Sequence, residues 1–345
     1  MVRRILLALT IAVSMWACST DDAPNDDAES GSAEITVADT ADAKTISFIE
    51  AKVDSFVLRY TPGQELQYRV RQFSEAGPDS AVATTNSTHV YTKKVRAVRS
   101  DGSFELTMRF DSVKVDAVVR NRNTGAVLLQ QSYSSSDSTH RSNDKFVQFN
   151  ALLGEEISVF VSPRGAILQV GDVTPIVKKM IATAKQEVSP QMSEQLAEQL
   201  KAAVYGSFHG QEIIPYPIGK IDSTGSWSNS MTTPLPEFFN VSTVASYHIA
   251  NVKEVKNRRI ASIDATIKGA FTVRPLPKDA PFSVKVNSSS ISGSSRSLLD
   301  VEGGYTISKK NTITMNVSAT IVSPKGERRS VSQSQVSRYE IELLP

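Results

Sequence analysis

The fold is decided by the stretch Thr312-Ile313-Thr314-Met315-Asn316-Val317-Ser318-Ala319-Thr320-Ile321, in which polar and apolar residues alternate throughout. A period of two places one set of side chains on each face of a β-strand, so one face can pack on a core while the other meets water. The same alternation occurs in Phe104–Phe110, Ile263–Ile267 and Leu66–Val70. Half-buried strands of this kind are typical of antiparallel sheets. The sequence therefore predicts a mostly β (α+β) fold with one large antiparallel sheet, curved or forming an incomplete barrel.

One strand changes phase, and short turns separate the others. The apolar residues from Phe104 to Phe110 stand at even positions, but Val113 and Val115 stand at odd ones, so a β-bulge or a strand break is expected at Asp111-Ser112. Proline and glycine at the second and fourth positions of a turn favour type I. The turns are expected at Asp101-Gly102, Asn123-Thr124-Gly125, Ser162-Pro163-Arg164-Gly165 and Ser323-Pro324-Lys325-Gly326.

A helical insert is predicted at about residues 174–206. Thr174-Pro175 and Ser189-Pro190 each offer an N-cap followed by proline at the first helical position. We expect the two helices to pack on one face of the sheet, because apolar residues recur at helical spacing in both. These residues are Ile176, Val177, Met180, Ile181 and Ala184, then Met192, Leu196, Leu200, Ala203 and Val204. The alternative is two consecutive β-domains, residues 53–170 and 217–345, joined by the helices.

The first residues have the pattern of an export signal. Residues 1–17 combine two arginines, a short apolar stretch and a small residue, Ala17, which predicts a secretory signal peptide too short to span a membrane. The only cysteine, Cys18, follows directly and resembles the lipobox of bacterial lipoproteins. That resemblance implies a diacylglyceryl anchor on Cys18, fatty acids such as palmitate, and, because Ser19 is not aspartate, an outer-membrane lipoprotein of the cell envelope. The alternative is a secreted protein with a spare thiol.

The segment after Cys18 differs in composition from the rest of the chain. Residues 18–50 contain nine Asp and Glu against a single lysine, and large apolar residues are sparse. Such a segment buries too little apolar surface to offset its ordering entropy, so residues 18–52 are expected to form an acidic, disordered tether. The β-rich body then covers residues 53–345. The formal net charge of +2 thus hides an acidic segment joined to a basic body.

Little in the sequence points to catalysis. A single cysteine excludes an intrachain disulfide framework and any multi-cysteine metal centre. His89, His140, His209 and His248 are scattered, and no hydrolase, nucleotide-binding or zinc motif is present. Ser207, His209 and Glu212 form a weak polar cluster, interpreted as a polar loop after a helix. We therefore predict no catalytic residue, no cofactor and no metal site.

Basic residues occur in adjacent pairs distributed along the body. Scattered pairs usually lie on solvated faces or strand edges, so they are not expected to form a nucleic-acid site. The pairs are Lys93-Lys94, Lys178-Lys179, Arg258-Arg259, Lys309-Lys310 and Arg328-Arg329.

Several short motifs resemble an uncharacterised family of bacterial envelope lipoproteins, over most of residues 55–345. They are Leu58-Arg59-Tyr60, Pro62-Gly63, Leu66-Gln67-Tyr68, Asp101-Gly102-Ser103, Phe149 to Gly154, Val161 to Gly165, Gly225-Ser226-Trp227 and Gly303-Gly304. These motifs are turns and strand starts, so the resemblance implies location and architecture and no active site.

Three functions remain open at this point. The first is a lipid-anchored, non-catalytic module that binds a protein partner or stabilises an assembly. The second is a carrier of a lipid or another apolar ligand held between sheet and helices, which requires an apolar cavity there. The third is a hydrolase whose site is assembled from distant residues, which requires histidines close to carboxylates. In all three the lipid on Cys18 would bind the membrane.

Overall fold

The computed structural model describes residues 35–40, 43–78, 80–184, 188–205, 212–217, 221–234, 239–274, 282–323 and 325–345. Its strands are β1 Lys44–Ile46, β2 Glu65–Gly77, β3 Ala81–Val98, β4 Phe104–Asn121, β5 Val127–Ser134, β6 Glu156–Val161, β7 Ile167–Val170, β8 Ser226–Pro234, β9 Phe239–Val255, β10 Arg258–Val273, β11 Ser283–Asp300, β12 Thr306–Val322 and β13 Arg328–Leu343. Its helices are η1 Ala38–Thr40, α2 Phe48–Ala51, α3 Ser138–Arg141, η2 Asp144–Phe146, α4 Val147–Leu152, α5 Thr174–Ala184 and α6 Pro190–Tyr205.

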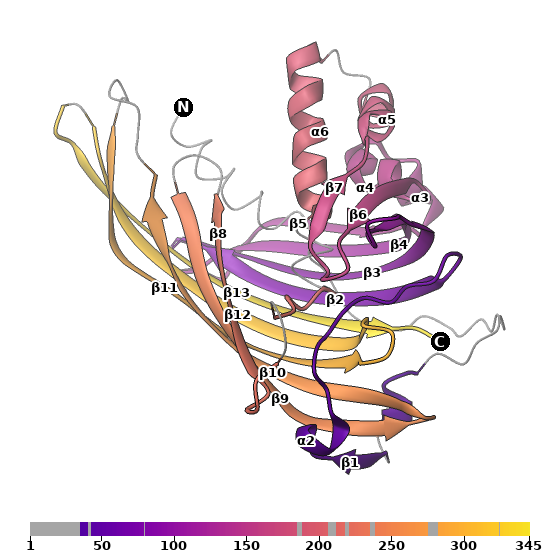
Figure 1. The fold of residues 1–345 in the computed structure, drawn as a ribbon. Helices are drawn as coiled ribbons and strands as arrows, with labels where there is room; N and C mark the ends of the chain where they lie inside the picture. Colours follow the sequence, from indigo (N-terminus) through magenta and orange to yellow (C-terminus); the bar gives the residue numbers. More distant parts are fainter. Residues whose placement is uncertain are drawn as a thin grey trace.

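The thirteen strands of the described residues form one antiparallel sheet. Its order is β1-β9-β10-β11-β12-β13-β2-β3-β4-β6-β7, with β8 also paired to β9 and β5 also paired to β4. The sheet is strongly curved and is open at both ends of this order (Figure 1). The prediction of a large, curved antiparallel sheet is confirmed. The alternative of two separate β-domains is wrong, because β13 pairs with β2 and joins the strands of both halves in one sheet.

The predicted irregularities lie where the sequence places them. Between β3 and β4, Val90 pairs with Ser112 but Tyr91 pairs with Phe110, so Asp111 is the extra residue of a bulge. Gly165 and Gly326 donate backbone hydrogen bonds of 2.9 Å to the carbonyls three residues earlier, which closes a β-turn at each position.

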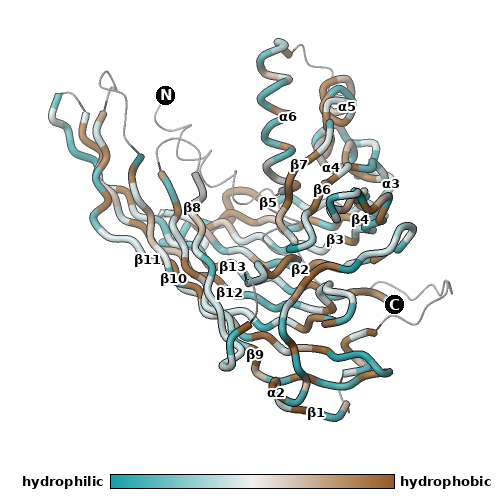
Figure 2. Tube along the Cα trace, in the orientation of Figure 1, coloured by the Kyte–Doolittle hydropathy of each residue, from teal (hydrophilic) through white to brown (hydrophobic). Residues whose placement is uncertain are grey.

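The two faces of the sheet differ in chemistry. We call the face that carries Tyr68, Tyr91, Ile263 and Lys309 the inner face, because the large hydrophobic core lies on it. From Lys309 to Ile321 of β12 the inner face receives the odd-numbered residues, which are mostly apolar, and the outer face receives the even-numbered ones, which are mostly Ser, Thr and Asn. Figure 2 shows the corresponding alternation of hydrophobic and hydrophilic residues along the strands.

Two segments without regular structure close the core on the inner face. Residues 53–60 contribute Phe56, Leu58 and Tyr60, all buried. Residues 212–217, which we call the strap, contribute Ile213 and Ile214. The two segments touch through the rings of Phe56 and Tyr216, whose centroids are 5.7 Å apart. They fill the place that a second layer would occupy in a sandwich.

The helices α5 and α6 occupy the segment where two helices are expected. They lie at the β6–β7 end of the sheet, where α5 packs on α4 and α6 contacts β7 (Figure 1). Val173, Ile176 and Val204 join the main core, but Met192 at the start of α6 is 53% exposed. The expectation that this second apolar stripe faces the core is therefore wrong at Met192, because α6 extends beyond the sheet.

The N-terminal tether is shorter than predicted. Residues 35–40 and 43–52 belong to the folded body: β1 pairs with β9, and Ser47 and Glu50 form a capping box on α2. Ile35 is fully buried in the main core, and Ile46 and Phe48 pack against it. The burial of these apolar side chains offsets the ordering entropy of the segment, which its acidic composition does not indicate. Residues 1–34, with the predicted signal peptide and Cys18, lie outside the described residues.

Candidate functional site: a buried charged cluster on the inner face

An ion pair is buried at the centre of the inner face. Lys93 on β3 is fully buried and Glu212 on the strap is 1% exposed. The Lys93 ammonium contacts the Glu212 carboxylate and also donates a 2.9 Å hydrogen bond to the Tyr60 hydroxyl. The Tyr91 hydroxyl donates to the other Glu212 oxygen at 2.9 Å. Both oxygens of the carboxylate are therefore satisfied, as burial of a charge requires.

A second lysine lies beside this pair. Lys309 on β12 is 7% exposed, and its ammonium donates a 3.3 Å hydrogen bond to the Ile213 carbonyl of the strap. Thr306 on the same strand donates a 2.8 Å hydrogen bond to the Glu212 carbonyl. Burial lowers the pKa of Lys309 to about 8, although the nearby Glu212 charge opposes this shift. The strap is thus fixed to β3 by charge and to β12 by hydrogen bonds.

Tyrosine rings surround the cluster. The Lys93 ammonium lies 5.0 Å from the ring centroids of both Tyr60 and Tyr68, which is cation–π distance. Burial, followed by the negative charge of Glu212, raises the pKa of the Tyr60, Tyr68 and Tyr91 hydroxyls well above the ordinary value. The hydroxyls of Tyr68 and Tyr91 donate to the Thr306 carbonyl and to the Glu212 carboxylate, whereas the Tyr60 hydroxyl accepts from Lys93. The positive charge of Lys93 and the donors of Tyr91 and Tyr68 are thus used within the chain, by the Glu212 carboxylate and the Thr306 carbonyl.

His89 lies next to Tyr91 on the inner face and is buried. Its ring packs against the rings of Tyr91 and Phe110, with centroids 6.2 Å and 5.9 Å apart. Desolvation lowers the pKa of His89 to about 4, so the ring is neutral near neutral pH. A neutral, packed imidazole at this position is part of the core.

The sequence interpretation missed the two lysines. Lys93 and Lys309 were expected on solvated faces with the other basic pairs, but the strand period makes this impossible for both members of a pair. In each pair one lysine must point inward, and Lys93 falls in phase with the apolar Tyr91 and Val95. Glu212 was interpreted as part of a polar loop and is instead buried in an ion pair. Ser207 and His209 lie outside the described residues.

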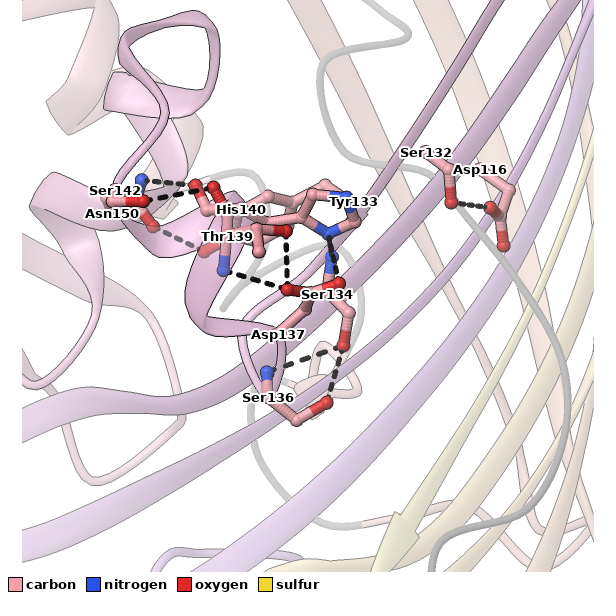
Figure 3. Close-up of polar contacts among 10 residues, drawn as sticks. All are labelled: Asp116, Ser132, Tyr133, Ser134, Ser136, Asp137, Thr139, His140, Ser142 and Asn150. Carbon is pink, nitrogen blue, oxygen red and sulfur yellow. Dashed lines mark hydrogen bonds and ion pairs between the residues drawn. The ribbon is translucent and has the colours of Figure 1, made fainter.

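The described histidines lie on three different elements and are not brought together. His89 is on β3, His140 on α3, and His248 on β9, where its Nδ1 lies 3.1 Å from the Ser226 hydroxyl. His248 also lies directly opposite Asp264 of β10. His140 forms a local cluster with Asp137, shown in Figure 3. There its Nδ1 accepts a 3.0 Å hydrogen bond from the backbone N–H of Ser134, and Asp137 caps α3 by accepting from the backbone N–H of Thr139. These contacts shape the turn between β5 and α3.

A small open pocket lies at the helical end of the sheet. Its volume is about 220 Å³, and Phe110, Asp111, Ser135, Arg141, Leu153 and Gly154 line it. This is less than the roughly 300–1,000 Å³ of typical small-molecule pockets, and its lining is mixed rather than apolar. It does not provide the apolar cavity between sheet and helices that a lidded carrier requires.

Neither a metal-ligand cluster nor a helix that could span a membrane is found in the described ranges. No three His, Cys, Asp or Glu side chains there gather in a way that could hold a metal ion. None of the helices in that part of the chain has the length and apolar character needed to cross a lipid bilayer.

Apolar side chains continue along the inner face beyond the main core. On β12 they are Ile313, Met315, Val317, Ala319 and Ile321, of which Ala319 is buried and the others half-buried. Met315 lies opposite Ile291 of β11, and Ala319 opposite Val286. The described helices pack on β4, β5, β7 and β9, away from this region. We call these residues of β11 and β12 the apolar row.

Comparison with solved structures gives only distant similarities. A structure titled "Lipid-protein interactions in lipovitellin" is 10% identical, with a TM-score of 0.43, and the match covers 83% of this chain and 26% of that one. The chain thus spans about a quarter of the lipovitellin chain. The COG4313 outer membrane channel from Pseudomonas putida F1 is 8% identical, with coverages of 83% and 97% and a TM-score of 0.22. The outer membrane protein OprG from Pseudomonas aeruginosa is 7% identical, with coverages of 82% and 94% and a TM-score of 0.21.

Comparison with sequence families is more specific. No curated protein matches the chain. The model described as "Family of unknown function (DUF6263)" matches residues 101–320. The function of this family is unknown, and the match agrees with the resemblance to an uncharacterised family. Because the matched residues are well over half of the 345, the chain belongs to DUF6263.

Proposed function

We propose that this protein is a non-catalytic binding module, anchored to the bacterial outer membrane by lipid on Cys18, which holds an acyl chain of a lipid against the inner face of its sheet. The observation that carries the proposal is the apolar row, which continues past the core and bears no described helix. The ligand lies on the open face, not in a cavity beneath α5 and α6.

The dimensions of the apolar row suit an acyl chain. From Ile313 to Ile321 the strand rises about 26 Å, at roughly 3.3 Å per residue. Half of the bilayer hydrocarbon core, the depth that one layer of acyl chains occupies, is about 15 Å. An extended acyl chain can therefore lie along β12 and contact alternate side chains over its whole length. A protein partner would need an exposed apolar helix or strand of its own to make the same contacts.

A substitution in the apolar row tests the proposal. Val317→Glu places a charge on the inner face, and we expect it to weaken binding of a dansyl-labelled fatty acid at least about tenfold, since an unpaired carboxylate against an acyl chain is strongly unfavourable. Binding is measured by fluorescence titration of the full-length protein after removal of bound lipid on a hydrophobic resin.

The matched control is Asn316→Glu on the same strand. Asn316 is exposed on the outer face, opposite Ser290 and Ser334, so this variant should bind the probe like the wild type. Equal affinity of the wild type and Val317→Glu, or no binding by the wild type, would contradict the lipid-binding proposal. Native mass spectrometry of protein purified from its own envelope identifies the occupant, and a stoichiometric protein there would replace the lipid in the proposal.

The anchor is tested separately with Cys18→Ser. We expect the wild type to incorporate labelled palmitate and to sediment with membranes, and the variant to do neither, because the thioether can form only on Cys18. Two or more acyl chains hold a protein stably on a bilayer, whereas none leaves the body without an anchor. A variant that stays in the membrane fraction while the wild type takes up no label excludes the anchor but leaves the apolar row untested.

A further inference from the structure

The inner face of β12 changes from charged to polar to apolar along one line. Lys309 and Asn311 are followed, at the next odd positions, by Ile313 and the rest of the apolar row. Side chains two residues apart lie on the same face of a strand, about 6–7 Å from each other. A ligand lying along this strand would meet a polar end first and then an apolar tract.

Two buried polar atoms at the polar end have no hydrogen-bond partner. Asn311 is 5% exposed and Ser295 is 9% exposed, and they are directly opposite each other on β12 and β11. The Asn311 Oδ1 and the Ser295 Oγ lie among the few buried side-chain atoms without a partner. Buried polar groups are nearly always satisfied, by protein or by something bound. The open hydrogen-bonding capacity therefore points to a group from outside the chain.

The donors available there favour an anion. The Asn311 amide contacts the Tyr339 hydroxyl at 2.5 Å, and because a hydroxyl can donate or accept, the amide can turn its two N–H donors toward a ligand. Ser295 offers an O–H donor, and directly opposite pairs have Cβ atoms about 4.5–5.5 Å apart, so one small group can reach both. Lys309 adds positive charge on the same strand. In a buried setting such charge-assisted hydrogen bonds are the strong ones.

From this juxtaposition we propose that Lys309, Asn311 and Ser295 form the headgroup site for a lipid with an anionic head, a carboxylate or phosphate, whose acyl chain lies along Ile313–Ile321. The proposal rests on the proposed lipid-binding function and adds the chemical class and the orientation of the ligand. The strap backs the site, because the Lys309 ammonium also contacts the Ile213 carbonyl.

The test compares two ligands that differ only in the head. Palmitate carries a carboxylate, whereas hexadecanol has the same chain length and no charge. With the full-length, lipid-free protein we expect calorimetry to show palmitate bound about tenfold or more tighter than hexadecanol, since the carboxylate gains charge-assisted hydrogen bonds. Lys309→Met should remove this preference while leaving hexadecanol affinity unchanged. The control Lys310→Met, on the outer face where the lysine pairs with Glu340, should keep it.

A second variant protects the test from misfolding. Asn311→Asp keeps the size of the side chain but places a carboxylate beside Lys309. It should therefore weaken the binding of palmitate and leave the binding of hexadecanol unchanged. An unchanged near-ultraviolet circular dichroism spectrum shows that the variant is folded. Equal binding of the two ligands by the wild type, or a preference that survives both variants, overturns the headgroup site but leaves the lipid-binding function in place. Failure to bind either ligand overturns the lipid-binding function itself. Acetate binding as tightly as palmitate would show a site for free anions and overturn the assignment to a lipid.

Discussion

Replacing Glu212 with glutamine should lower the free energy of unfolding by about 3 to 5 kcal/mol, because it leaves the buried Lys93 ammonium without its carboxylate. The ion pair joins β3 to the strap, and both side chains are almost completely excluded from water. Lys93 cannot move into solvent, and the strap cannot leave the sheet, without opening the core around Tyr60 and Tyr68. The measurement is equilibrium unfolding in urea, monitored by tryptophan fluorescence.

The adjacent lysine provides a matched control. Lys94 pairs with Glu65 on the outer face, where both side chains are partly exposed. Exposed ion pairs contribute only about 0 to 1 kcal/mol, so Glu65→Gln should change the unfolding free energy by no more than that. Comparable losses in the two variants would show that Glu212 is not held in the buried pair. The double variant Lys93→Met/Glu212→Leu should recover most of the loss, since it removes both charges from the core.

The second large effect is a dependence of stability on pH through His89. The folded pKa of about 4 lies below the ordinary value of 6.5, so between these values the unfolded chain binds the proton and the folded protein does not. The contribution of the neutral His89 to the free energy of unfolding is therefore fully present above about pH 6.5 and is lost as the pH falls toward about 4. Between about pH 7 and about pH 5 the loss through this one side chain is about 2 kcal/mol.

The His89→Gln variant should lack this part of the pH dependence. Its unfolding free energy, measured in urea at about pH 7 and about pH 5, should change by about 2 kcal/mol less than that of the wild type. His248→Gln, on an exposed side chain, should keep the wild-type behaviour. Identical pH profiles of the wild type and His89→Gln would contradict burial of a neutral His89.

Local patterns in the sequence were sufficient for the strands and turns. The alternation in Thr312–Ile321 depends only on neighbouring residues, and so does the phase change at Asp111 that becomes the bulge. The order of the strands is different, because the β13–β2 pairing joins residues that are far apart in the chain. Periodicity predicts which residues face inward but does not predict which strands become neighbours.

The charged cluster could be predicted only in part. The phase of Lys93 and Lys309 within their strands indicates that both point toward the core, because two adjacent lysines in a strand face opposite sides of the sheet. Their partner could not be predicted in this way, because Glu212 stands in the strap and reaches Lys93 only through the tertiary fold. The same reason explains why residues 35–52 were expected in a tether: their few apolar side chains are buried by β9 and the core, which composition does not reveal.

The β13–β2 pairing also determines the order in which the chain can fold. β2 begins at Glu65, but its partner on one side is β13, which begins at Arg328 and is synthesised about 260 residues later. Until then the centre of the sheet has an open edge and the two halves are not joined. Pairing between such distant segments is slow, because the chain must close a long loop first. Completion of the sheet is therefore expected to be a late and slow step of folding, after the strands of each half have paired with their neighbours.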